Sequence, residues 1–443
     1  MNITQTLRRD CNSCPKARPG MLHALLAVGC LIGCDQPARD YETEIAACAD
    51  LPGARASENS RLQQALRDVE LAHRLPQQMI RQPPPDEENA AVALAQVFND
   101  RSREQLDAVT HAAMPTDRFE FDEKQLVKVK RLLRRWETER VQLAAATKLP
   151  RCGFAIDFER GYFAEHPFLT ETAVAVRLAL LECVPSLVDG DLDAAQRNLS
   201  RALRWIGWLA DEQLLEAKVL AARLRGEALL AVEAIAWHPL ADPATWRELL
   251  KLLQQQLDHW PSDEAGLIGD RARSLHAYEV IRRGMLDLLL TLEERAKLVE
   301  DEQLDRLQNL SREAVDLDEA LYLETMQKII ALSDVPFFER QPKLAELYGK
   351  LESQANGRGY PELAMRLFLA DLVAAQEQLA RDRGRYEGWA ITLAAAVGDE
   401  LPPYTTNPLN GHAYEVRRTI QETTITLGDA DSRDPGVPAL PRL

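Results

Sequence analysis

Three aspartates near the C-terminus come closest, by residue type and spacing, to a metal site. Asp429, Asp431 and Asp434 lie in the segment GDADSRDPG. Carboxylate oxygens are the ligands that calcium prefers, so this acidic loop is a candidate calcium site. The EF-hand pattern is not met, because Asp434 stands five places after Asp429 rather than four and no glutamate follows at the bidentate position. The alternative is a solvated acidic turn, and no cofactor other than calcium is expected.

The other reactive side chains match none of the common enzyme motifs. No two of the eight histidines have H-x-x-x-H spacing, which argues against a helical zinc site. The sequence also contains neither the G-x-S-x-G nucleophile elbow nor the G-x-x-x-x-G-K-[ST] phosphate loop. No residue is therefore assigned a catalytic role.

Five tryptophans that lie close together in the sequence allow two interpretations. They are Trp205, Trp208, Trp237, Trp246 and Trp260. Exposed rings could stack on sugars, and paired carboxylates in a cleft beside Trp205 or Trp246 would then favour a hydrolase. The spacing among Leu and Ala favours the other interpretation, in which the rings fill a helical core. Trp208 and Trp237 are expected to be the most deeply buried.

The chain between residues 86 and 386 reads as helix, and this predicts a mainly α protein built as an antiparallel helical-hairpin bundle or solenoid-like array. Asp122 and Gln125 have capping-box spacing ahead of a helix expected to run to about residue 149. Asp242 and Pro243 are typical of a helix start. Gly190, Ala195 and Ala202 have the spacing of one tetratricopeptide unit, which we interpret as a single helical hairpin because no second unit follows.

The segments on either side of this helical body differ from it. Residues 34–85 are expected to form a tether with short helices that ends at a proline-rich break. Residues 387–443 form a tail in which two β-rich runs, 413–417 and 423–427, predict a hairpin. A lone hairpin is marginal in water, so we expect it to rest on a helix over 361–382.

Cys34 ends a short apolar run that follows a basic segment. The order of basic, apolar and small residues over 1–33 is that of a secretory signal peptide, and the run is too short to span a membrane. Leu31-Ile32-Gly33-Cys34 resembles the bacterial lipoprotein box, which implies cleavage before Cys34 and lipidation of its thiol. Cys30 is a poorer alternative, and translation from Met21 would remove the basic residues. Asp35 resembles the signal for retention in the inner membrane.

The charge balance limits the partners. The chain has a net charge of −16, and removal of residues 1–33, which carry +3, leaves −19. This acidity argues against a nucleic-acid partner and is expected to keep the folded body off an anionic membrane surface. The basic patch of Lys128, Lys130, Arg131, Arg134 and Arg135 is either a solvated face or a docking surface for an acidic partner. Of the later cysteines, Cys152 and Cys183 could form a disulfide; the alternative is that these two and Cys48 are all reduced.

The tail carries the most specific resemblance. Gly384-Arg385-Tyr386, Leu401-Pro402, Asn407-Pro408 and Leu427-Gly428-Asp429 resemble the C-terminal part of type II secretion major pseudopilins. Glu387 replaces the proline of that pattern, and Asn407 stands where it has aspartate. The resemblance implies calcium binding in the acidic loop at Asp429, whereas the pilin N-terminal helix is missing.

These features together predict a bacterial envelope protein that acts by binding. The chain resembles uncharacterised envelope lipoproteins, anchored by lipid and facing the periplasm, with the inner membrane favoured over the outer. Its expected role is that of a protein-binding or assembly factor whose partner is another envelope protein. The alternative is a helical-toroid hydrolase acting on envelope polysaccharide.

Overall fold

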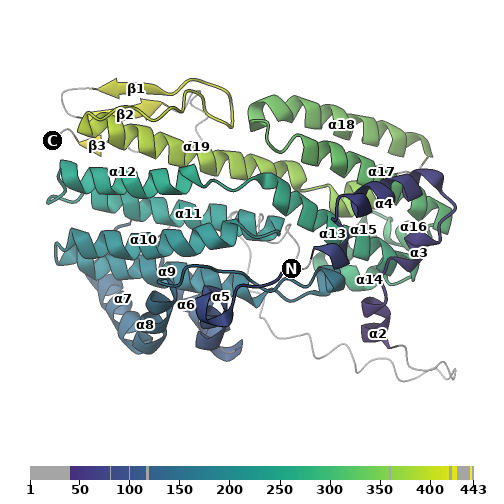
Figure 1. Ribbon diagram of the computed structural model, residues 1–443, viewed down its shortest axis with the longest axis horizontal. Coiled ribbons are helices and arrows are strands. Elements are labelled where there is room, and N and C mark those ends of the chain that lie inside the picture. Colours follow the sequence, from purple (N-terminus) through teal and green to yellow (C-terminus); the bar gives the residue numbers. More distant parts are fainter. Residues whose placement is uncertain are drawn as a thin grey trace.

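The protein is mainly α-helical, with a small antiparallel sheet at its C-terminal end, as the helical periodicity predicted (Figure 1). The computed structural model describes residues 40–79, 81–98, 100–115, 119–358, 361–418, 422–426 and 440–441. Helices that follow one another in the sequence pack as adjacent pairs, which confirms the predicted hairpin architecture.

The first described segment packs on the body. It contains α2 (Tyr41–Ala46), α3 (Pro52–Arg55), α4 (Ser60–Leu71) and the short 3-10 turns η2 (Pro76–Gln78) and η3 (Asp86–Glu88). The N–H groups of Gly53 and Ala54 donate to the carboxylate of Glu279 at 2.8 and 2.7 Å. The described part of the expected tether thus has the short helices predicted for it, and they are held against the helices that follow.

A group of short helices projects from one long side of the molecule: α5 (Ala90–Val97), α6 (Asp100–Ala113), α7 (Glu123–Arg135) and α8 (Glu137–Ala146). The capping box of Asp122 and Gln125 is confirmed. The single helix expected over this stretch is instead broken at Trp136, whose φ and ψ are −113° and 35°. Arg140 stabilises the break, because its guanidinium donates to the Leu133 carbonyl at 2.5 Å.

Four long helices form the left half of the molecule in Figure 1: α9 (Pro167–Val188), α10 (Leu192–Ala210), α11 (Leu215–Ala236) and α12 (Pro243–Asp258). The 3-10 segment η4 (Phe158–Phe163) precedes them. Gly190 joins α9 to α10 with a φ of +72°, a conformation that favours glycine. Ala195 and Ala202 are fully buried, so the predicted hairpin and its close contact are confirmed. Asp242 caps α12 as expected, accepting from the N–H of Thr245.

The other half is built around α13 (Asp263–Arg282), which is buried along almost its whole length. The helices that follow are α14 (Leu286–Leu289), α15 (Leu292–Glu300), α16 (Leu304–Gln308), α17 (Arg312–Ala331) and α18 (Phe337–Arg358). Buried charges on α13 and α17 pair with one another: Arg282 contacts Glu279, Asp316 and Glu319. This pairing explains how a helix with many charged residues can lie in the interior of the protein.

The last helix is longer than predicted. A π-helical turn η5 (Ala364–Phe368) precedes α19 (Leu372–Val397), which passes through Tyr386 and ends where Gly398 adopts a φ of +75°. The expected end near Asp382 was wrong, because the apolar run after Gly388 is buried as helix. Strands β1 (Glu415–Arg418), β2 (Glu422–Thr426) and β3 (Leu440–Pro441) form an antiparallel sheet in that order. This sheet lies on α19, so the predicted hairpin and its helical support are confirmed, with the support displaced along the chain.

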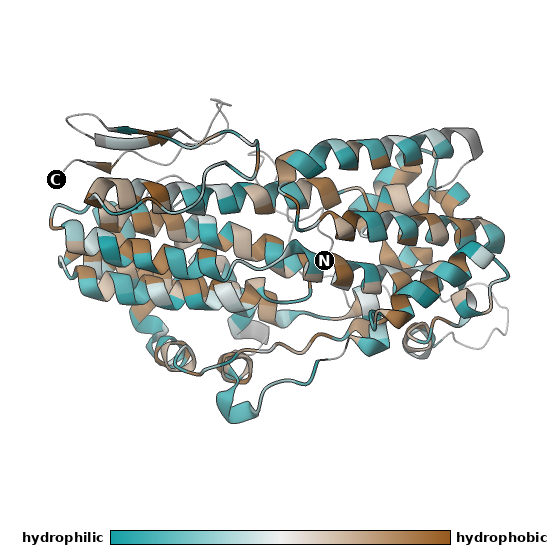
Figure 2. Ribbon diagram, turned by 45° about the horizontal axis from the view of Figure 1, so that its top comes forward, coloured by the Kyte–Doolittle hydropathy of each residue, from teal (hydrophilic) through white to brown (hydrophobic). Residues whose placement is uncertain are grey.

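The long helices carry hydrophobic and hydrophilic residues side by side (Figure 2). Among the described residues, no helix is long and apolar enough to cross a membrane. The described cysteines Cys48, Cys152 and Cys183 are free thiols, so the disulfide considered between Cys152 and Cys183 is not present.

Candidate functional site

The residues predicted from the sequence for metal binding and lipidation lie outside the described residues. These are Asp429, Asp431 and Asp434 in the acidic loop, and Cys34 near the N-terminus. In the described part of the chain, no group of three or more His, Cys, Asp or Glu side chains is placed to hold a metal ion.

The tryptophans belong mainly to the core. Trp205 and Trp246 are each 1% exposed, and the indole N–H of Trp246 donates to the Ala236 carbonyl at 2.9 Å. The expectation that Trp208 and Trp237 are the most deeply buried was wrong: Trp208 is only partly buried, and Trp237 is 45% exposed. Trp237 is the C-cap of α11, so its ring projects beyond the packed part of that helix.

A carboxylate that shares a small cavity with Trp205 is not free for chemistry. Glu182 lines a small cavity beside Trp205. Its two oxygens accept from Arg140 at 2.5 Å and from Arg201 at 2.7 Å. The predicted hydrolase arrangement of paired carboxylates beside Trp205 therefore finds no support at this position.

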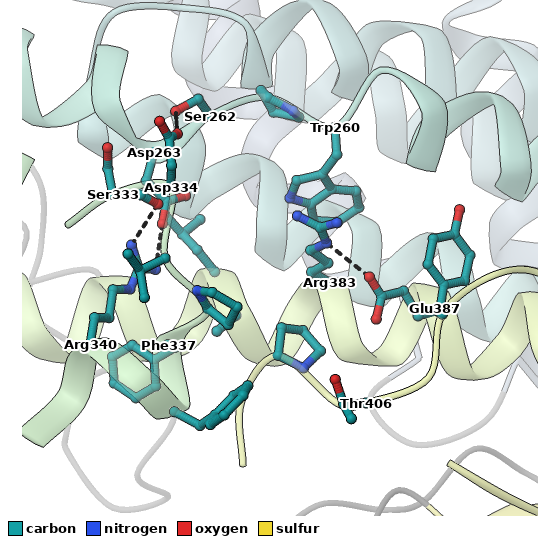
Figure 3. Close-up of a pocket in the computed structure, with 18 of the residues that line it drawn as sticks. Trp260, Ser262, Asp263, Ser333, Asp334, Phe337, Arg340, Arg383, Glu387 and Thr406 are labelled. Carbon is teal, nitrogen blue, oxygen red and sulfur yellow. Dashed lines mark hydrogen bonds and ion pairs between the residues drawn. The ribbon is translucent and has the colours of Figure 1, made fainter. Parts of the chain in front are cut away.

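A cleft of about 460 Å³ lies where four separate segments of the chain meet (Figure 3). Its walls are the α12–α13 connection, the α17–α18 connection, one side of α19 and the tail segment around Thr406. A volume of this size is within the range of ligand sites, roughly 300–1,000 Å³. The cleft is the candidate functional site.

Arg340 fixes two of these walls to each other. Its guanidinium donates to the carboxylate of Asp263 at 2.6 Å and to the Ser333 carbonyl at 3.1 Å, as the dashed lines in Figure 3 show. Both charged side chains are largely buried. Removing one partner of a buried ion pair typically costs about 3–5 kcal/mol, so this contact holds the α12–α13 and α17–α18 connections in place.

A second polar chain runs along α19 to the tail. Arg383 contacts Glu387 at 2.9 Å, and the hydroxyl of Tyr414 donates to the other oxygen of Glu387 at 2.8 Å. Burial raises the pKa of Glu387, an effect that Arg383 and Tyr414 oppose. The side chain of Arg383 is 44% exposed and makes no other hydrogen bond within the described part of the chain, so its terminal nitrogens are available to a ligand.

One face of the Trp260 ring packs on the buried ion pair of Arg225 and Asp382. The guanidinium of Arg225 lies 4.3 Å from the centre of this ring and contacts Asp382 at 2.8 Å. Burial raises the pKa of Asp382 to about 6, although Arg225 opposes the shift. A cation stacked on one face fixes the orientation of the indole, which presents a rigid surface in the cleft.

The tail is seated on the cleft by close backbone contacts. The N–H of Phe338 donates to the Pro408 carbonyl at 3.3 Å. A side chain at Gly384 would meet the amide of Asn407 at 2.7 Å, and one at Gly411 would meet the Phe338 ring at 2.7 Å. Glycine is therefore needed at both positions for the tail to approach α18 and α19.

The lining of the cleft combines paired charges with aromatic rings. It contains neither histidine nor cysteine. Two of its carboxylates, Asp263 and Glu387, are engaged with arginines, while Trp260, Phe338 and Tyr404 supply rings. The ion pair of Asp263 and Arg340 was not predicted from the sequence, because the two residues are 77 positions apart. Three lining residues had been named from the sequence: Trp260 among the five tryptophans, and Glu387 and Pro408 in the resemblance of the tail to pseudopilins.

Comparison with protein-family models, with curated proteins and with solved structures gave no match.

Proposed function

We propose that this protein is a membrane-anchored lipoprotein of the bacterial envelope that binds a segment of another envelope protein in the cleft at Trp260 and Thr406. The observation that carries this proposal is that the cleft is formed before any ligand arrives. The buried ion pair of Asp263 and Arg340 joins two of its walls, and a hydrogen bond from Tyr414 to Glu387 joins the tail to α19. A site that is rigid beforehand loses less conformational entropy on binding.

The chemistry of the lining favours an extended peptide segment that carries an acidic residue. Aromatic rings and prolines from three of the walls offer flat surfaces to side chains of a partner. The exposed N–H groups of Arg383 can donate charge-assisted hydrogen bonds to a carboxylate. The anchor at Cys34 is part of this proposal and rests on the lipoprotein box.

Site-specific photo-crosslinking tests the binding site. A photoreactive residue at the exposed cleft position Thr406 should capture one defined partner in intact cells, whereas the same residue at Leu292, exposed on α15, should not. Arg383→Gln should weaken the Thr406 crosslink about ten-fold, since hydrogen bonds to charged groups contribute about 1.5–3 kcal/mol. Arg417→Gln, which removes the same charge from an exposed site on β1, serves as the matched control.

Two results would contradict binding at the cleft. One is equal capture from Thr406 and Leu292, and the other is a Thr406 crosslink that is as strong in Arg383→Gln as in Arg417→Gln. Intact-mass measurement of the membrane-derived protein tests the anchor separately.

A further inference from the structure

Helix α7 concentrates positive charge on a strongly acidic protein. Six of its thirteen residues are Lys or Arg, against a single acidic residue, Glu123. The cations are Lys124, Lys128, Lys130, Arg131, Arg134 and Arg135. All are exposed except Lys130, which is partly buried. Such a helix stands out on a chain whose net charge is −16.

The cations share one face. With 3.6 residues per turn, all of them except Lys130 fall within an arc of about 120°. Val129 and Leu133, which are buried, lie on the opposite side and fix α7 to the body. The cationic face must therefore point away from the protein, and it extends for about 20 Å along the helix.

Within the part of the chain that the structure describes, these cations also have no carboxylate partner. Elsewhere on the surface arginines are paired, as in Arg61 with Glu324 and Arg74 with Glu264. No cation of α7 makes an ion pair within the described part of the chain, and Arg135 contacts only the ring of Trp136, at 5.6 Å. Their charge is available to an anion outside the molecule.

The surroundings of α7 favour a lipid surface over an acidic protein. Val127, 52% exposed, lies within the cationic arc, and Val141 on α8 is exposed nearby. Figure 1 shows α7 and α8 projecting from the same lower edge of the molecule as α2, where the described chain begins. Cys34 precedes Asp40 by six residues, which span at most about 20 Å. A lipid anchor at Cys34 and helix α7 can therefore contact the same membrane surface.

We propose that α7 docks on anionic phospholipid headgroups, with its cationic face on the phosphates, and thereby orients the body on the membrane. This inference rests on the proposed function for its location in the envelope. The acidic remainder of the protein is repelled by the same surface. Docking through α7 would direct α18 and α19, which lie toward the opposite edge in Figure 1 and contribute walls of the cleft, away from the lipid.

Vesicle sedimentation with the chain from Asp35 onward tests the docking without any contribution from a lipid anchor. This chain retains the whole described core, which begins at Ile45. It should bind vesicles that contain phosphatidylglycerol and phosphatidylcholine but not vesicles of phosphatidylcholine alone. Binding should disappear at 1 M salt, where the screening length falls from about 10 Å to about 3 Å.

Two triple variants with the same change in net charge locate the contact. The triple variant with Lys124→Gln, Lys128→Gln and Arg131→Gln should bind anionic vesicles about 100-fold more weakly, because each lost cation lowers the partition coefficient about five-fold. Lys297→Gln, Lys328→Gln and Lys343→Gln together, at exposed sites on α15, α17 and α18, should leave it unchanged.

Equal loss in the two triple variants would overturn the proposal, as would the absence of binding to anionic vesicles. Binding of polyglutamate, but not of anionic vesicles, with dependence on Lys128 would assign α7 to an acidic protein instead. If Cys34 is not lipidated, intact-mass measurement will show no acyl mass on it. That result would not affect the vesicle measurement, which uses a chain without Cys34.

Discussion

Replacement of Trp246 by alanine should destabilise the protein strongly, because this ring on α12 is buried and is hydrogen-bonded to the end of α11. The side chain is 1% exposed. A tryptophan buries about 200 Å², which at about 25 cal/mol per Å² contributes about 5 kcal/mol. Alanine retains part of that burial, so a loss of about 3–5 kcal/mol is expected. The Ala236 carbonyl, which accepts from the indole N–H, loses its partner and adds about 1 kcal/mol.

Urea denaturation followed by circular dichroism measures this loss, and Trp237→Ala is the matched control. Trp237 is 45% exposed, so the same truncation there should cost about 1 kcal/mol or less. Similar free energies of unfolding for the two variants would refute the reasoning. A loss below about 1 kcal/mol for Trp246→Ala would mean that the ring is accessible, and the sugar-platform interpretation would then gain support.

Three further predictions concern the chain ends and the interior. Intact-mass analysis should show the mature chain starting at Cys34 with added acyl mass, and Cys34→Ser should leave the precursor uncut; a chain starting at Cys30 would contradict this. Calorimetric titration at millimolar calcium should give binding heat, and this heat should be lost when Asp429 and Asp431 are replaced by alanine. The absence of heat, together with no rise in melting temperature, would exclude a calcium site formed by Asp429, Asp431 and Asp434. Burial raises the pKa of Asp270 to about 6. Between about pH 4 and pH 6 this group therefore binds more protons in the folded state than in the unfolded state. Its contribution to the free energy of unfolding falls as the pH rises through that range. Asp270→Asn should therefore raise the melting temperature at pH 7.5 by more than at pH 4, and equal shifts at both pH values would contradict the assignment.

Local patterns predicted the local structure well. The caps at Asp122 and Asp242 and the strands at 415–418 and 422–426 follow from short-range preferences and are present. The break at Trp136 was missed, because it is stabilised by Arg140 and its pairing with Glu182, 42 positions further on. The end of α19 was misplaced for a similar reason: helical residues after Tyr386 are buried against the neighbouring helices.

The candidate site was less predictable than the helices. The pattern of Trp, Leu and Ala indicated a core but could not rank the rings, since Trp205 and Trp208 differ by less than one helical turn and yet differ in burial. The ion pair of Asp263 and Arg340 matches no sequence pattern, because its two residues are far apart along the chain.

The helical hairpins, the β-hairpin of the tail and the cationic face of α7 could be predicted from the sequence, since each depends on residues that are close together along the chain. The acidity of the chain follows from its composition. The tertiary structure decided which tryptophans are buried, how the charges of α13 are satisfied and where a cleft opens. Those outcomes depend on pairs that lie far apart in the sequence, such as Arg225 with Asp382 and Asp263 with Arg340. The physical reason is that periodicity specifies which face of a helix is buried, whereas the partner that covers that face is specified only when the helices pack.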